Sequence, residues 1–158
     1  RRRRVLGVAG PVRPRRSRCR SCRITHVLLP AVLLLRLGHG AATVWAVLMA
    51  RAGGTGYRPT ASSAGVSIST VRRWWRRFTG RADEVRRWFW RLAVAVGIDP
   101  EIPDASGSAP ADAVAAITAA AAGRGQRFGG SVVGMAAQVH MASVGSGGRL
   151  LAPAWPGG

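Results

Sequence analysis

Residues 68–79 constrain the fold more than any other stretch, because their apolar and basic side chains fall on opposite sides of one helix. The apolar residues recur at i, i+3, i+4 and i+7: Val71, Trp74, Trp75 and Phe78. At about 100° per residue they share a single apolar stripe. The opposite arc carries a serine and four arginines: Ser69, Arg72, Arg73, Arg76 and Arg77. The pattern predicts a helix with one buried face and one cationic face.

The segment before this helix predicts a second, shorter helix and a tight turn. Residues 57–64 lead into Gly65-Val66, and Ser67 then stands at the N-cap position of the longer helix. A serine hydroxyl at this position accepts from a free backbone N–H of the first turn. Pro59 is tolerated only in the first turn of the shorter helix. After the longer helix, Gly80 predicts a left-handed closing residue.

The spacing across both helices resembles the helix-turn-helix of bacterial repressors and transposases. The resemblance rests on Ala61, Gly65, Val71 and Trp74, within the run A-x-x-x-G-x-S-x-x-T-V-x-R-W. It implies that the helices cross at the small residue, turn at the glycine and bury two apolar residues beneath the second helix. It also implies that the second helix enters the major groove of duplex DNA. The alternative is an ordinary amphipathic helical hairpin with a solvated basic face.

The charge distribution favours a polyanion as partner. The net charge is +18, and all 24 basic residues are arginine. Of these, 21 lie in residues 1–91 together with two acids, Asp83 and Glu84, whereas the remainder has three arginines and four acids. A basic first part and a nearly neutral remainder indicate a nucleic-acid-binding region with an appended segment. We therefore expect Ser67, Ser69 and the helix arginines on double-stranded DNA, and the N-terminal arm on phosphates.

Cys19 and Cys22 are the only cysteines, and their C-x-x-C spacing is that of a zinc knuckle. One knuckle supplies half of a tetrahedral ligand set. His26 and His39 would complete a Cys2His2 set, although not at a standard finger spacing. A redox C-x-x-C would need a βαβ context, which the sequence does not predict. The alternatives are thus a zinc cofactor held by the two cysteines, or two free thiols.

A second resemblance covers most of the chain. The run R-C-R-S-C-R-I-T-H-V-L-L-P, followed by the predicted helix-turn-helix and by S-G-G-R-L-L-A-P at residues 146–153, is similar to an uncharacterised bacterial domain-of-unknown-function family. Members of that family look like a zinc ribbon fused to a transposase-type DNA-binding domain. The resemblance implies that Cys19 and Cys22 are zinc ligands and that a further C-x-x-C precedes the first arginines. We therefore expect this sequence to be a piece of a longer reading frame.

The whole chain predicts a mainly α protein in three parts. Residues 41–52 would be the first helix of a three-helix, homeodomain-like helix-turn-helix unit, and residues 85–96 predict a further helix closed by Gly97. Their aromatic residues are expected to form a shared core: Trp74, Trp75, Phe78, Trp88 and Phe89. The parts are a basic arm with a partial zinc-ribbon knuckle, the helix-turn-helix domain, and a linker with an Ala-rich helical segment, at residues 1–36, 37–97 and 98–158.

The C-terminal part predicts little buried surface. After a Pro-, Asp- and Ser-rich linker over residues 98–109, an Ala-rich helix is expected at 110–122, and G-R-G-Q-R-F-G-G would break it. A short helix is expected at 131–143, followed by a loose tail from Gly145. Since alanine side chains bury little area, this part either packs on the preceding domain or forms a homo-oligomer.

The sequence disfavours a membrane-spanning protein and an enzyme. The apolar run 27–35 is too short to cross a membrane, contains Pro30 and is closed by Arg36. An enzyme is also not expected, because carboxylates outside the basic part lie in or beside the linker with no strands to hold a metal pair: Asp99, Glu101, Asp104 and Asp112.

The sequence thus predicts a cytoplasmic, nucleoid-associated protein that binds duplex DNA with full or partial sequence specificity. Its role would be regulatory or derived from a mobile element. The alternatives are the DNA-binding part of a catalytic transposase, and a basic RNA-binding protein with a zinc knuckle.

Overall fold

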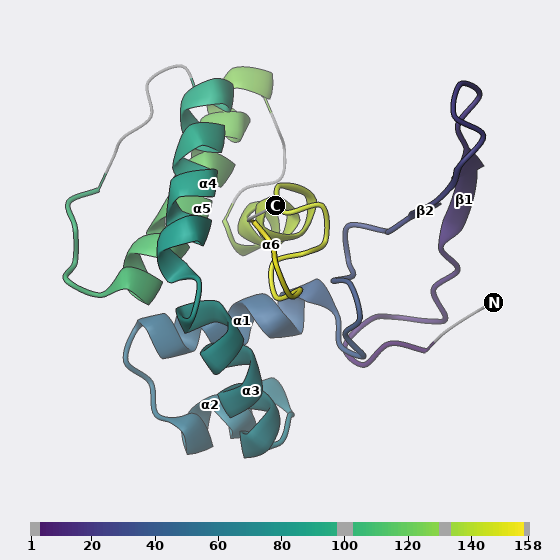
Figure 1. Ribbon diagram of the computed structural model, residues 1–158. Coiled ribbons are helices and arrows are strands. Elements are labelled where there is room, and N and C mark those ends of the chain that lie inside the picture. Colours follow the sequence, from purple (N-terminus) through teal and green to yellow (C-terminus); the bar gives the residue numbers. More distant parts are fainter. Residues whose placement is uncertain (1–3, 98–102, 130–133, 157–158) are drawn as a thin grey trace.

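The structure is a computed structural model that describes residues 4–97, 103–129 and 134–156. These residues form six helices and one two-stranded sheet, which confirms a mainly α class (Figure 1). The helices are α1 (Ala41–Ala52), α2 (Tyr57–Ala64), α3 (Ile68–Thr79), α4 (Ala82–Val96), α5 (Ala109–Phe128) and α6 (Met135–Val144). The strands are β1 (Arg15–Arg18) and β2 (Thr25–Leu28).

Local signals define the ends of α2 and α3. Gly65 closes α2 in the left-handed conformation, with φ 61° and ψ 35°, where glycine pays no Cβ penalty. Ser67 then caps α3, and its Oγ accepts from the backbone N–H of Thr70 at 3.2 Å. The left-handed conformation expected at Gly80 is wrong, because φ there is −63° and ψ is −6°. Only two residues separate α3 from α4: Gly80 stays in the right-handed helical region, and the turn is made at Arg81, with φ −142° and ψ 21°.

The core is centred on aromatic rings from α1, α3 and α4. Trp74, Phe78 and Phe89 are fully buried as expected, and each contributes about 1.5–3 kcal/mol through burial. The expectation was wrong for Trp88, which is 40% exposed, and Trp75 is only half-buried. The central position belongs instead to Trp45, whose Nε1 donates to Oε1 of Gln138 at 3.1 Å.

Helix α5 is continuous where a break was expected. It runs through the glycine-containing segment after Ala122, and packs closely along α4 (Figure 1). Gly123 is buried at this contact, where an added Cβ would lie 3.0 Å from Cα of Gly97. Each glycine costs a helix about 1 kcal/mol relative to alanine, and here the close approach of two backbones offsets that cost. The expected helix over 131–143 begins at Met135, and residues 131–133 lie outside the described ranges.

The C-terminal segment from Gly145 is packed, so the expectation of a loose tail was wrong. Leu150, Leu151 and Trp155 are buried against the helices. The Trp155 ring meets the Trp88 and Phe89 rings edge to face, at centroid distances of 5.7 and 6.2 Å. The apolar residues that follow the glycines of this segment therefore reach the core, although its composition had predicted a loose tail.

Arg81 fastens this C-terminal segment. Its Nη1 donates to the backbone oxygens of Ala152 and Trp155, the latter at 2.6 Å. One buried cluster joins α1, α3 and α4 with α5, α6 and the segment after Gly145. This cluster includes residues on both sides of residue 98, where the third part of the chain was expected to begin. Asp99 and Glu101 of the expected linker lie outside the described ranges.

The two strands form a hairpin that projects from the helical body (Figure 1). They pair antiparallel, with Arg15 opposite Leu28 and Arg18 opposite Thr25, and every strand residue is exposed. Within the ranges that the structure describes, no helix is both long and apolar enough to span a membrane.

We predict that Trp74→Ala lowers the free energy of unfolding by about 3–5 kcal/mol, because it leaves a cavity under α3. This loss compares with a total of about 5–15 kcal/mol for a typical domain. Trp90→Ala removes a half-buried ring and is expected to cost clearly less. Urea denaturation followed by circular dichroism measures both losses. Equal losses would show that Trp74 has no special place in the core.

The contact between α4 and α5 predicts that alanine substitution changes the stability of the protein differently at two glycines of α5. Gly125→Ala should stabilise the protein by about 0.5–1 kcal/mol, because an added Cβ there meets no atom within 4 Å and alanine favours helix. Gly123→Ala should be neutral or destabilising, because its Cβ would press on the backbone of Gly97. Thermal melting of both variants tests this, and equal stabilisation by both would contradict the close contact.

Candidate nucleic-acid interface

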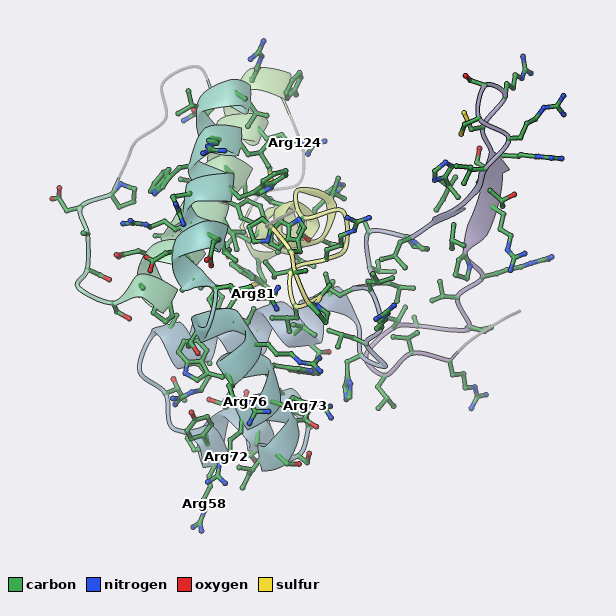
Figure 2. All side chains as sticks on the ribbon, viewed as in Figure 1. Arg58, Arg72, Arg73, Arg76, Arg81 and Arg124 are labelled. Atoms are coloured by element: carbon green, nitrogen blue, oxygen red, sulfur yellow. The ribbon has the colours of Figure 1, made fainter. Side chains whose placement is uncertain are left out.

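Helix α3 has the two-sided character that the sequence predicts. Its inner face is completely buried through Val71, Trp74 and Phe78. Its outer face is exposed at every polar position expected there: Ser69, Arg72, Arg73, Arg76 and Arg77. Figure 2 shows Arg72, Arg73 and Arg76 at one end of the molecule, with Arg124 at the opposite end. The buried face fixes how α3 sits on the body, so the outer face is presented as a rigid unit.

The arginines of α3 have no carboxylate on their own helix or on α1 and α2, which pack against it. The first acidic residue of the chain is Asp83, so α1, α2 and α3 contain none. Within these three helices the positive fields of the arginines therefore add, and no negative charge opposes them. Guanidinium groups present planar forks of N–H donors that match the oxygens of phosphates and the edge of guanine. This surface is suited to a large anion.

Three hydroxyls organise the N-terminal turn of α3. Oγ of Ser67 accepts from the Thr70 N–H, donates to Oγ1 of Thr70 at 2.9 Å and lies 2.9 Å from Oγ of Ser69. The Ser67 hydroxyl is therefore committed to the helix cap. Ser69 is exposed one turn from Arg72 and Arg73 and remains the serine best placed to meet a ligand.

Sequence reasoning missed Arg58, in the first turn of α2. It is exposed and lies at the same end of the molecule as Arg72 (Figure 2). The signal that could have found it is its position next to the free N–H groups at a helix start, where the positive end of the helix dipole adds to the arginine charge.

Cys19 and Cys22 lie together in the turn between β1 and β2, and both are free thiols. The turn is closed by the Cys19 N–H donating to O of Ile24 at 2.9 Å and by the Arg23 N–H donating to O of Cys19 at 3.1 Å. Hydrogen bonds from the Cys22 backbone N–H, then from its thiol, and from the Ser21 N–H lower the pKa of Cys19. The Cys19 thiol therefore ionises more readily than an ordinary cysteine.

The two candidate histidines lie in different surroundings. His26 is exposed on β2 opposite Ser17, whereas the His39 ring stands edge-on to Trp74, with centroids 5.0 Å apart and an interplanar angle of 82°. In the described part of the chain, no three His, Cys, Asp or Glu side chains lie close enough to hold one metal ion. Among these described residues the hairpin turn brings together two thiols, which are half of a tetrahedral ligand set.

Comparison of the chain with known proteins finds no matching family model, no matching curated protein and no matching solved structure. The family resemblance seen in the sequence therefore stays a prediction.

We predict that zinc binds this chain weakly, because two thiolates are half of a tetrahedral set. A complete structural zinc site contributes roughly 10–16 kcal/mol to folding, which a half site does not reach. Metal analysis of protein purified without chelator, with Cys19→Ser as the matched control, measures the stoichiometry. One zinc per chain that disappears in Cys19→Ser would overturn this prediction and implicate further ligands.

Proposed function

We propose that the protein binds duplex DNA through a helix-turn-helix formed by α2 and α3, with α3 as the recognition helix. The observation that carries this proposal is the outer face of α3, where four exposed arginines lie without a carboxylate on α1, α2 or α3. The left-handed Gly65 and the Ser67 cap support the motif, because they set the sharp turn between the two helices.

The dimensions of α3 suit the major groove. Its 12 residues make a helix about 18 Å long, and the groove of B-DNA, about 12 Å wide, admits one α-helix. In this orientation Ser69, Arg72, Arg73 and Arg76 face base edges. Arginine can bond to both O6 and N7 of one guanine, so a preference for G-containing sites follows. Arg77 lies further along the helix, where we assign it to phosphate.

The hairpin and the N-terminal arm add contacts that do not depend on sequence. Arg15, Arg16 and Arg18 are exposed on β1 and have no acid within the first 82 residues of the chain. Arginines of this kind bind phosphates and release counterions, which makes affinity fall with salt. The proposed assembly therefore has one element that reads bases and another that holds the backbone.

Binding rather than catalysis is the proposed role. The exposed polar groups of α3 are guanidinium groups, which hold anions but do not exchange protons near neutral pH, together with the hydroxyl of Ser69. A regulatory protein or a protein derived from a mobile element would use such a module to locate a DNA site. Selection of bound sequences from random duplex DNA, with single-stranded RNA as competitor, tests this proposal. A chain that enriches no duplex sequence, or that prefers RNA, refutes it.

We predict that α3 and the hairpin contribute differently to DNA affinity. Arg73→Ala should weaken binding to a selected site by about 1–3 kcal/mol and relax the base preference at one position. The double change Arg15→Ala and Arg16→Ala should weaken all duplexes alike and reduce the salt slope by up to about 0.9 per lost phosphate contact. Fluorescence anisotropy across a salt series measures both effects. Identical behaviour of the two variants would disprove α3 as the recognition helix.

A further inference from the structure

The ring of Tyr57, the first residue of α2, contacts two arginine side chains from two other helices. Cζ of Arg51, in the last turn of α1, lies 3.9 Å from the ring centroid. Cζ of Arg72, on the outer face of α3, lies 5.5 Å from the same centroid. Both distances fall within the range of about 6 Å in which a cation is attracted to an aromatic face. Three helices thus meet around one ring.

Arg51 is the fixed member of this group. Its Nη1 donates to the backbone oxygen of Thr55, and its Cζ also lies 5.3 Å from the Trp75 ring centroid. The side chain is half-buried, with its Nε removed from solvent. A guanidinium held between two rings and a carbonyl is not free to follow a ligand, so Arg51 supports Tyr57 instead of binding DNA itself.

Arg72 is the exposed member, and orientation matters most for it. An unrestrained arginine has many rotamers, and fixing one of them opposes binding. A ring beside the guanidinium restricts these rotamers before the ligand arrives, which reduces the entropic cost. A carboxylate in the same place would orient Arg72 as well but would neutralise it, whereas an aromatic ring leaves its charge available.

We propose that Tyr57 is a positioning residue that holds Arg72 in the orientation in which it meets a base edge. This inference rests on the proposed function, because it gives one arginine of α3 a special part in DNA recognition. The Thr55 carbonyl accepts a hydrogen bond from Arg51, and the Arg51 guanidinium packs on the Tyr57 ring. The same ring in turn contacts Arg72. Arg73, on the same face, has no aromatic contact of this kind among the described residues and serves as the internal comparison.

The test is a double-mutant cycle on binding of the full chain to its selected duplex. Tyr57→Leu should weaken binding about 2- to 5-fold, the range expected for an exposed cation–π contact. Tyr57→Phe keeps the aromatic face and should restore affinity to within about twofold of the unchanged protein. In an Arg72→Ala background, Tyr57→Leu should cause no further loss, because the side chain that it positions is gone.

The Arg73→Ala background is the matched control, in which Tyr57→Leu should weaken binding by the same factor as in the unchanged protein. Melting curves of each variant give a readout of folding that is separate from affinity. A loss that persists in the Arg72→Ala background, or a Tyr57→Phe protein as weak as Tyr57→Leu, would overturn the positioning role alone. If the unchanged chain shows no preference for any duplex, the proposed function fails and the positioning role fails with it.

Discussion

Burial of the inner face of α3 is the constraint on which the other features depend. Trp74 lies at the middle of this face, fully buried, with the His39 ring edge-on against it. His39 is held by backbone hydrogen bonds between Leu6 and its neighbours Gly38 and Gly40, so the root of the N-terminal arm is tied to the same core. Because α3 cannot rotate without exposing Trp74, its arginine face has one fixed direction relative to the body.

The C-terminal half supports this arrangement from the other side of the core. Helix α5 lies against α4 through the backbones of Gly123 and Gly97, and the segment after Gly145 covers Phe89 with the Trp155 ring. Arg81 donates hydrogen bonds to backbone oxygens of that segment. A structural arginine of this kind differs from those of α3, which keep their donors in solvent.

Arginine side chains of the N-terminal part pack against aromatic rings for a physical reason. With 18 arginines before the first acid, the N-terminal part must fold against its own repulsion. Rings and carbonyls can hold a guanidinium without cancelling its charge, as the environment of Arg51 illustrates. This leaves the net charge of the surface intact for an anionic partner, and the proposed positioning of Arg72 by Tyr57 uses the same interaction.

The sequence by itself determined the local features: α1, the α2–α3 pair with Gly65 and Ser67 at its turn, α4, and the division of α3 into a buried and a cationic face. Helix caps, glycine conformation and helical periodicity depend on residues within a few positions of one another, so they can be predicted from the local sequence. Only the tertiary structure decided that α5 continues through Gly123, that the C-terminal segment is packed, and that Trp45 rather than Trp88 is central. It also decided that Tyr57 meets Arg72. These outcomes depend on close packing between residues distant in the chain, whose energies outweigh local propensity.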